Sequence, residues 1–372
     1  MSPRTAVVVG GVGKLPYAGL SVYYLHHLAG LQELGYRVHY LERQHRSWET
    51  YAPERDEMPD RADSAVRHIA RMAELFGFVD DWSFIDVEGV CHGAGWKRLR
   101  AVLDDADFVM TVADPTWFDE LERCERRIFI DGDPMFTQIA LVTGEGTRAE
   151  APRHYDTLFT YAARLGAEDC LVPDAGLRWL PARPVVATAH WRPAPIATDA
   201  PIVALMHWAA GSDLRFEGKE YGYKDREFAK IAALPRRRPG EYLLAAGGGG
   251  VPRHELGGAG WTLVNPLGAS LTMDRLRAFI DGSRADLGVA KHAYVVSRSG
   301  WFSDRSTCFL ASGRPVLHQD TGYLDWLPVE EGVLPFDDLD SLIEAIERLD
   351  ADPARHARAA RRVAEEHFEA RV

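Results

Sequence analysis

The sequence predicts an α/β protein with two Rossmann-like parallel-sheet domains that face a cleft. Three observations lead to this fold class. The chain has 372 residues, which is too long for one ordinary hydrophobic core. Short β-branched runs alternate with amphipathic stretches, a pattern typical of parallel strands covered by helices on both faces. The alternation stops at 181–201, which carries five prolines and little periodicity, and then starts again.

The first half alternates between strands and helices from its beginning. The run TAVVV predicts a strand, and Gly35 is a suitable left-handed cap for the helix that follows it. The expected strands are 5–9, 37–41, 82–87, 107–112, 127–130 and 158–161, and the expected helices are 21–34, 62–76, 96–103 and 118–124.

The second half repeats this pattern after the proline-rich linker. We expect domains over 1–190 and 197–352 and a C-terminal helical segment over 353–372. Ligands of such sheets bind beyond the carboxyl ends of the strands, so the loops after strands are the places to look for chemistry. The expected strands are 202–206, 242–246, 261–264, 293–297, 315–319 and 332–336, and the expected helices are 225–233, 273–280, 305–311, 339–349 and 353–369.

Composition excludes several classes of protein. The net charge of -12 argues against a nucleic-acid binder, although a few arginines can still make a local site for a small anion. The four cysteines are far apart, which argues against a disulfide framework or a structural zinc site and favours the cytoplasm. We find no signal peptide and no segment apolar enough to span a membrane. The excess of arginine over lysine is typical of a GC-rich bacterial genome.

The first glycine-rich loop resembles a nucleotide-binding loop but fits neither standard pattern. A Walker A loop would need glycine at Val8 and a hydroxyl residue at Leu15, and the dinucleotide pattern would need glycine at Pro16. Glu42, at the end of the second strand, is weak support for NAD on its own. We interpret Gly11 and Gly13 as an open turn that lines the cleft.

The stretch RSGWFSDRS contains a predicted anion site. Gly300 favours a turn, and Ser303 is a suitable N-cap for a helix that begins near Asp304. A helix N-terminus attracts anions, and Arg298 and Arg305 would add charge-assisted contacts. The alternative is a surface cap in which Asp304 and Arg305 pair with each other.

The wider pattern of the second half resembles the donor-binding domain of GT-B glycosyltransferases. The resemblance rests on Gly300–Trp301, on ASGRPV at 311–316 and on the loop after the next strand. Across both halves, GLQELGYRVHYLE, IDGDPMFTQ, YGYKDREF and RSGWFSDRS are similar to a little-characterised bacterial group of predicted glycosyltransferases, distantly similar to UDP-glycosyltransferases. This resemblance implies a GT-B fold whose last helix crosses back to the first domain.

The resemblance also implies a donor site. Arg298 occupies the position of a histidine that contacts the donor's diphosphate in the UDP-glycosyltransferase signature. Lys224 lies where GT-B enzymes often offer a basic residue to the diphosphate, or is a solvated lysine. Asn265, in WTLVNP, is the candidate for the nucleobase. The diphosphate is assigned to Arg298, Ser299, Gly300, Ser303, Asp304, Arg305 and Ser306, and the sugar to Asp320, Thr321 and Gly322.

The first domain would then hold the acceptor and a base. Asp131 and Asp133 follow a strand in IDGDP, where an aspartate either takes the acceptor's proton or holds the turn before Pro134. His92 is the next candidate, against the ordinary role of a surface histidine. Tyr17, with Gly11 and Gly13, is assigned to the acceptor side. We expect no metal, because GT-B enzymes generally release the diphosphate with a helix dipole and basic residues.

Together these features predict a cytoplasmic hexosyltransferase. It would move a sugar from a UDP- or dTDP-sugar, as co-substrate, to a small-molecule acceptor, with natural-product biosynthesis as a compatible setting. It would need no other cofactor, would not bind nucleic acid or span a membrane, and would be a monomer or homodimer. The alternatives are a nucleotide-sugar epimerase or hydrolase of the same fold, an NAD-linked oxidoreductase, and a non-catalytic binder of sugar nucleotides.

Overall fold

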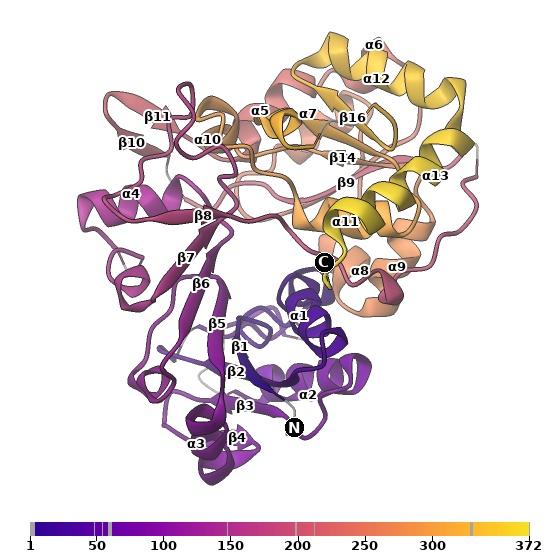
Figure 1. Cartoon of the computed structure of the whole chain (residues 1–372). Coiled ribbons are helices and arrows are strands. Elements are labelled where there is room, and N and C mark those ends of the chain that lie inside the picture. Colours follow the sequence, from indigo (N-terminus) through magenta and orange to yellow (C-terminus); the bar gives the residue numbers. More distant parts are fainter. Residues whose placement is uncertain are drawn as a thin grey trace.

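In the computed structural model, the chain forms two sheets, the first lying below the second in Figure 1. The structure describes residues 4–47, 49–53, 55–58, 62–146, 148–197, 199–211, 213–327 and 330–371. The first sheet uses strands between residues 5 and 181, and the second uses strands between residues 202 and 336. The predicted two-sheet α/β fold is therefore confirmed. The proposed domain limits stay predictions.

The first sheet has eight strands in the order β4-β3-β2-β1-β5-β6-β7-β8, all parallel except β4. Its central strand β1 is buried on both faces. Val8 packs in the cluster that contains α1 and α2, whereas Val7 and Val9 pack in the cluster that contains α3. This double burial explains why TAVVV is a continuous apolar run. The strands are β1 (Thr5–Val9), β2 (Arg37–Arg43), β3 (Trp82–Ile85), β4 (Cys91–Gly93), β5 (Phe108–Ala113), β6 (Arg127–Asp131), β7 (Thr157–Thr160) and β8 (Trp179–Pro181).

The helices of the first half occupy the positions between these strands. They are α1 (Ala18–Glu33), α2 (Asp63–Phe76), α3 (Gly95–Asp105) and α4 (Phe136–Thr143). The helix expected at 118–124 is a 3₁₀ segment, Asp119–Arg123. Helix α4 was not predicted from the sequence.

The second sheet has six parallel strands in the order β13-β12-β9-β14-β15-β16. Its strands are β9 (Ile202–His207), β12 (Tyr242–Gly247), β13 (Thr262–Leu263), β14 (Ala285–Gly288), β15 (Val316–Gln319) and β16 (Val333–Phe336). A small antiparallel pair, β10 (Leu214–Phe216) and β11 (Lys219–Tyr221), stands apart from it. The helices are α5 (Lys224–Ile231), α6 (Leu234–Arg237), α7 (Arg253–Gly258), α8 (Pro266–Ser270), α9 (Met273–Asp281), α10 (His292–Val296), α11 (Asp304–Ala311), α12 (Leu339–Ala351) and α13 (Pro353–Val363).

One predicted strand of this half is wrong. Residues 293–297 lie mostly in helix α10, and the strand that was expected there is β14, a few residues earlier. Short apolar runs such as AYVV do not distinguish a strand from a buried helix by periodicity. The true strand was hidden by Asp286, whose buried carboxylate accepts hydrogen bonds from Arg305 and Ser306.

The C-terminal segment returns to the first half, as the fold class predicts. Helix α13 continues into a π-helical turn, Ala364–Phe368, and the backbone N–H of Val186 donates to the carbonyl of Phe368 at 2.7 Å. Ala370 packs against Gly30 of α1, where a Cβ would lie 2.3 Å from the Ala370 carbonyl oxygen. Figure 1 shows the C-terminus beside α1.

Arg314 attaches the linker to the second half. Its side chain is fully buried and donates to the carbonyls of Ala194 and Pro195 in the linker and of Ile280 and Asp281 at the end of α9. No carboxylate pairs with it within ion-pair distance in the described ranges. Burying an arginine is favourable only when its donors are satisfied. These four carbonyls satisfy the donors of Arg314 and so offset the cost of burying its charge.

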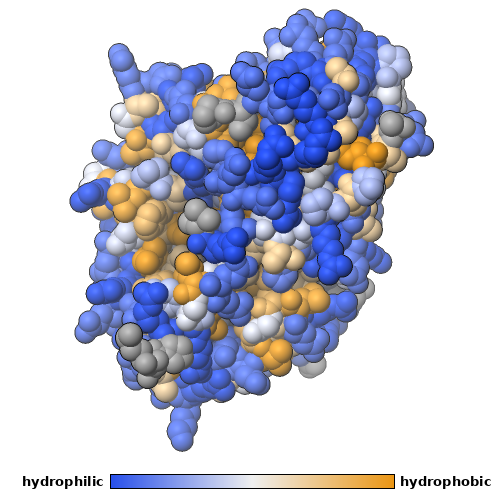
Figure 2. Space-filling view, turned by 45° about the vertical axis from the view of Figure 1, so that its right-hand side comes forward, coloured by the Kyte–Doolittle hydropathy of each residue, from blue (hydrophilic) through white to orange (hydrophobic). Residues whose placement is uncertain are grey.

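No helix in the part of the chain that the structure describes is long and apolar enough to cross a bilayer. The face in Figure 2 is mostly hydrophilic, with apolar residues interspersed among polar ones.

Replacing Arg314 by Met should lower the free energy of unfolding of the second half by about 3 kcal/mol, because buried carbonyls lose their donors. Urea unfolding followed by tryptophan fluorescence measures the change. The control Arg275→Met, on the exposed surface of α9, should change it by no more than about 0.5 kcal/mol. Equal effects of the two substitutions would contradict the anchoring role.

Candidate active site

The carboxyl ends of the two sheets meet at Asp133. This residue follows β6 in the first half, and its Oδ1 lies 2.6 Å from the ammonium of Lys291, which follows β14 in the second half. The hydroxyl of Tyr294, on α10, donates to the same oxygen, and Arg148 donates to Oδ2 at 2.8 Å. Burial alone would raise the pKa of Asp133, but the charges of Lys291 and Arg148 outweigh it and hold the pKa well below its usual range.

These contacts belong to a longer row of alternating charges across the first sheet. Lys14 lies 3.0 Å from both Asp114 and Glu49, and Asp114 lies 3.9 Å from Arg148. We call Lys14, Asp114, Arg148, Asp133 and Lys291 the charge row. It links the loops after β1, β5 and β6 to the second half.

Asp131, the other predicted base of IDGDP, is fully buried at the end of β6. It accepts hydrogen bonds from Thr137 at 2.7 Å and from Gln138 and Thr160 at 2.8 Å, and burial raises its pKa. The backbone N–H of Asp133 also donates to it. Asp131 thus fits the alternative role of holding this turn, because its carboxylate has no surface through which an acceptor's proton would leave.

His92 lies apart from these aspartates. It belongs to β4, the outermost strand, at the bottom of Figure 1 and away from the second half. Its Nε2 lies 2.7 Å from a carboxylate oxygen of Asp86. The structure does not bring His92 together with Asp131 or Asp133, so a catalytic role for it gains nothing from the geometry.

The glycine-rich loop after β1 is held by Glu42. The Glu42 carboxylate accepts from the backbone N–H groups of Gly13 and Lys14, at 2.7 and 2.8 Å, and from the hydroxyl of Tyr40. Burial raises its pKa to about 7, although these hydrogen bonds favour the charged form. Because both carboxylate oxygens serve the loop itself, the ribose contact of an NAD enzyme is not open to them.

The glycines of this loop meet close neighbours. A Cβ at Gly11 would lie 3.0 Å from the Tyr24 hydroxyl, and one at Gly13 would lie 2.9 Å from Ala65. Tyr17 is the N-cap residue of α1 and is half-buried. The structure therefore explains both glycines by packing, and it leaves an acceptor contact by Tyr17 as a prediction.

The N-terminus of α11 forms as predicted, with Ser303 as its N-cap. The Ser303 hydroxyl accepts from the backbone N–H of Ser306 at 3.4 Å. The side chains of Arg305 and Ser306 turn away toward the sheet. Arg305 donates to the carbonyl of Leu205 and lies 3.2 Å from Asp286, and Ser306 donates to Asp286 at 2.6 Å. At the start of α11, the backbone N–H groups rather than these side chains are therefore available to a ligand.

Arg298 forms an ion pair with the first half. Its backbone has a φ of +48°, and its Nε lies 2.7 Å from a carboxylate oxygen of Asp169. The neighbouring Ser299 is fully buried, and its hydroxyl donates to the carbonyl of Tyr294. Arg298 is thus in the predicted loop, but its guanidinium already has a carboxylate partner.

Arg164 of the first half fills the space between the two predicted donor loops. Its backbone N–H donates to the carbonyl of Ser299, and its Nε lies 2.5 Å from Asp325. A Cβ at Gly300 or at Gly322 would lie 2.7 Å from the Arg164 side chain. Both glycines have positive φ and leave room for protein.

The remaining predicted sugar and base contacts make local hydrogen bonds. Asp320 accepts from the backbone N–H of Gly322 at 2.8 Å, and the Thr321 hydroxyl donates to the Trp301 carbonyl at 2.5 Å. Asn265 is the N-cap of α8 and accepts from the backbone N–H of Leu267. Each of these arrangements fits an ordinary turn or cap, and the predicted ligand contacts stay predictions.

Lys224 is the predicted donor residue whose charge is least satisfied. It is half-buried at the start of α5, with its ammonium 5.9 Å from the ring of Trp301. In the described ranges it has no carboxylate within 4.0 Å. Burial, together with the charges of Arg305 and Lys291, lowers its pKa to about 7, although Asp304 and Asp286 act in the opposite direction.

Sequence reasoning missed several residues at this junction. Lys291 and Tyr294 were overlooked because β14 was not recognised, so the loop after it was placed on the wrong element. Arg148 and Arg164 lie in irregular segments that carry no motif. The glycine run 247–250 at the end of β12 was also overlooked, although it is visible in the sequence. No group of three or more potential metal ligands of the His, Cys, Asp or Glu type occurs among the described residues.

Comparison with known proteins supports the fold. Residues 231–372 match the family model described as "Glycosyl transferase-like". An alpha-glucosyltransferase solved in complex with UDP and a 13-mer DNA containing an HMU base superposes with a TM-score of 0.57 at 9% identity, over 99% of this chain and 96% of that one. Anabaena HepE, in complex with UDP and glucose, gives 0.55 at 12% identity over the same shares.

No curated protein sequence matches the chain. The expected GT-B fold is confirmed by these structures, in agreement with the two Rossmann-like sheets and the returning C-terminal segment.

Replacing Asp133 by Asn should lower the melting temperature by several degrees, because Lys291 would lose its carboxylate partner and Arg148 would keep only the more distant Asp114. The expected loss is about 2 kcal/mol, below the value for a fully buried pair because Asp133 is partly exposed. The wild type's advantage should persist above the usual carboxylate pKa and fade as the pH falls through the depressed pKa of Asp133.

Thermal melts at several pH values make this comparison. The control Asp156→Asn breaks an ion pair with Arg127 on the surface and should cost less than about 1 kcal/mol. An Asp133→Asn protein as stable as the control would show that the contact between the halves does not depend on this charge.

Proposed function

We propose that this chain is a glycosyltransferase that moves a sugar from a UDP- or dTDP-sugar to a small-molecule acceptor. The second half would bind the donor and the first half the acceptor. The GT-B fold, the glycosyl transferase-like match of residues 231–372 and the UDP named with both structural neighbours support the reaction class. The observation that carries the proposal is Lys224, a half-buried ammonium beside the start of α11 that has no carboxylate within 4.0 Å among the described residues.

A diphosphate fits this place on physical grounds. The first backbone N–H groups of α11 are a favourable environment for an anion. Lys224 carries a charge that burial and its cationic neighbours make unfavourable in the free protein, and an anion would relieve that cost. Lys291 is near enough for its charge to act on Lys224. It would add a second positive charge to the site if it left Asp133 and bound the ligand.

In the transfer step the acceptor's hydroxyl oxygen forms a bond to the anomeric carbon, and the bond from that carbon to the diphosphate oxygen breaks. The nucleoside diphosphate leaves with the electron pair, and the acceptor's proton passes to a base. Lys224 and the α11 N-terminus would stabilise the charge that develops on the leaving diphosphate. With these groups the reaction would need no metal and no cofactor beyond the nucleotide sugar.

Asp133 is the predicted base nearest to the second half. Its lowered pKa makes it a weak base while it pairs with Lys291 and Arg148. Base function would require Lys291 to move onto the donor, which would leave Oδ1 of Asp133 with the Tyr294 hydroxyl as its remaining partner.

The acceptor is proposed to be a small molecule rather than DNA. The alpha-glucosyltransferase in the comparison was solved with DNA, but this chain carries a net charge of -12, which disfavours a polyanion. We propose that the chain is a bacterial cytoplasmic enzyme that acts in natural-product biosynthesis.

Thermal shift with UDP, dTDP and NAD tests the donor class. Stabilisation by UDP or dTDP is expected, and stabilisation by NAD alone would overturn the proposal. Incubation with a UDP-sugar in the absence of acceptor then separates the alternatives, because an epimerase or hydrolase would turn over without one.

Lys224→Gln should weaken the binding of UDP-glucose about tenfold and leave the binding of uridine nearly unchanged, because only the first ligand carries the diphosphate. Isothermal titration calorimetry measures both affinities. The matched control is Arg298→Gln, whose guanidinium pairs with Asp169 and which we expect to matter less. The reverse ranking of the two variants would return the diphosphate role to Arg298.

The same site predicts a pH dependence of donor binding. The pKa of Lys224 is lowered to about 7, so the ammonium is fully charged only below that value. A bound diphosphate favours the charged form, and UDP-glucose affinity should therefore fall about tenfold as the pH rises from 6.5 to 8.5. UDP-glucose suits this test because its diphosphate does not titrate there. Lys224→Arg, which keeps its charge, should flatten the profile, and an unaltered profile would exclude Lys224 as its origin.

A further inference from the structure

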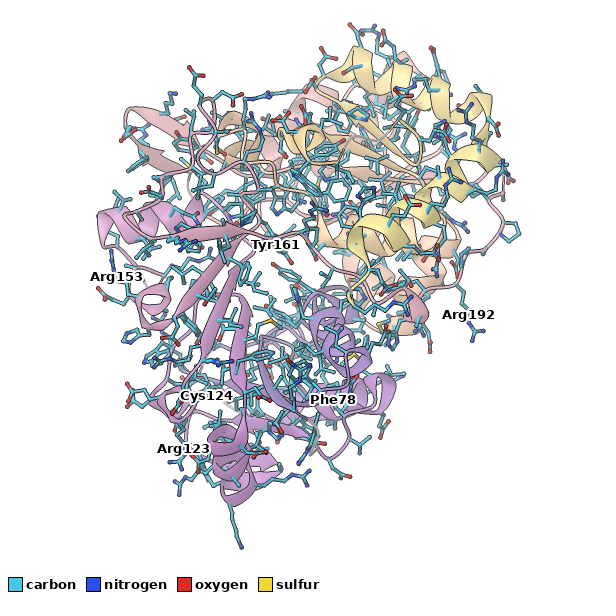
Figure 3. The ribbon with its side chains drawn as sticks, in the orientation of Figure 1. Phe78, Arg123, Cys124, Arg153, Tyr161 and Arg192 are labelled. Carbon is cyan, nitrogen blue, oxygen red and sulfur yellow. The ribbon has the colours of Figure 1, made fainter. Side chains whose placement is uncertain are left out.

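A pocket lies where the linker meets the second half, outside the candidate active site. Its volume is about 320 Å³, and its walls come from the linker, from α9 and from the end of α11 at Ser312. Figure 3 places Arg192, one of its lining residues, at the outer right edge, whereas Tyr161 lies between the two sheets.

The linker side of the pocket is fixed by contacts to other parts of the molecule. Trp191 is buried, and its indole N–H donates to Nε2 of His26 on α1 at 3.1 Å. The His190 ring stacks on Phe76 of α2, with ring centroids 4.3 Å apart. Arg361 of α13 donates to the carbonyl of Trp191. This wall is therefore tied to the first half and to the C-terminal helix.

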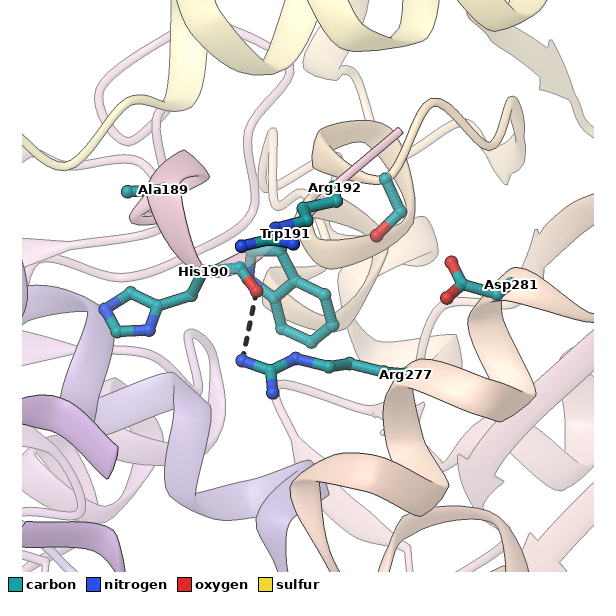
Figure 4. A pocket seen from close by; sticks show the side chains of 7 residues that line it. Ala189, His190, Trp191, Arg192, Arg277 and Asp281 are labelled. Atoms are coloured by element: carbon teal, nitrogen blue, oxygen red, sulfur yellow. Dashed lines mark hydrogen bonds between the residues drawn. The ribbon is translucent and has the colours of Figure 1, made fainter. Parts of the chain in front are cut away.

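Two arginines, Arg192 and Arg277, face the pocket. Arg277 of α9 donates to the carbonyl of His190 at 3.2 Å, which uses one of its five N–H donors. Arg192 is exposed, and in the described ranges neither guanidinium has a carboxylate within 4.0 Å. Figure 4 shows both guanidinium groups on the side of the pocket beside Trp191.

Asp281 supplies the opposite charge on the opposite wall. It lies one helical turn after Arg277 on α9, and its carboxylate forms no ion pair within 4.0 Å in the same ranges, although its charge acts on the buried Arg314 below. In Figure 4 the carboxylate stands across the pocket from the guanidinium groups. The pocket thus has a cationic end with two planar donors and an anionic end with two acceptors.

We propose that this pocket binds a small phosphorylated sugar, with the phosphate on Arg192 and Arg277 and a hydroxyl group on Asp281. Paired guanidinium groups are suited to phosphate because their N–H donors match its oxygens. A carboxylate at the far end favours a ligand with hydroxyl donors over a plain anion. The site is separate from the proposed donor site.

Isothermal titration of the full chain with glucose 1-phosphate tests the proposal, with the donor site first saturated by UDP. Binding is expected to persist with UDP present and in Lys224→Gln, and to weaken at least tenfold in Arg192→Gln and in Arg277→Gln. Arg192 is exposed, so its variant tests the idea even if the Arg277 variant folds poorly.

Further arms separate the two ends of the pocket. Asp281→Asn should weaken glucose 1-phosphate and leave inorganic phosphate unaffected, and glucose alone should not bind. The control Arg275→Gln, on the exposed face of the same helix, should change nothing. Competition by UDP, loss in Lys224→Gln, or an equal effect of Arg275→Gln would each overturn the proposal. The first two outcomes would report on the donor site, whereas the third would not. The proposal for this pocket therefore fails or succeeds independently of the proposed transferase activity.

Discussion

At the carboxyl ends of the two sheets, the contact between the halves centres on one carboxylate, that of Asp133. It stands at the carboxyl edge of the first sheet and receives an ammonium and a phenol hydroxyl from the second half and a guanidinium from its own. Buried charge is unfavourable unless it is matched, so the contact is specific in position as well as in sign. It brings the loops after β6 and β14 together.

The second half reaches this junction with more positive charge than the first half neutralises. Lys291 is matched by Asp133, whereas Lys224 is matched by no carboxylate within ion-pair distance in the described ranges. An unmatched ammonium beside a helix start is costly in the free protein and useful in a complex with a diphosphate. The same reasoning applies to Arg192 and Arg277. They have no carboxylate within ion-pair distance in the described ranges, and this distinguishes their pocket, as a second place for an anion, from the many arginines that have acidic partners.

Much of the fold was predictable because the two sheets are buried on both faces. Continuous runs such as TAVVV have few alternatives to a central strand, and the proline-rich linker separates the two sets of strands clearly. The strand β14 was missed because Asp286 interrupts its apolar pattern, and only the tertiary contact with Arg305 makes an aspartate acceptable there. An apolar helix, α10, was then assigned as a strand in its place.

The places of the candidate residues in the fold were predictable, but their partners were not. Asp133 lies at the expected strand end after β6, and Lys224 and the start of α11 lie at the expected helix starts. The sequence does not show which side chains bind other parts of the protein. Arg298 pairs with Asp169, and Gly300 makes room for Arg164, and both partners come from a segment more than a hundred residues earlier.

The contact between Val186 and the C-terminal segment limits how the molecule can open. The chain passes between the halves twice, once through the linker and once after α13, and the two passages hydrogen-bond to each other at Phe368 and Ala370. Two chains joined side by side bend easily about an axis that crosses them and resist twisting about their own length. The halves should therefore open about an axis that crosses the two passages, which would separate the loop after β6 from the loop after β14 and keep these loops in register for the next closure.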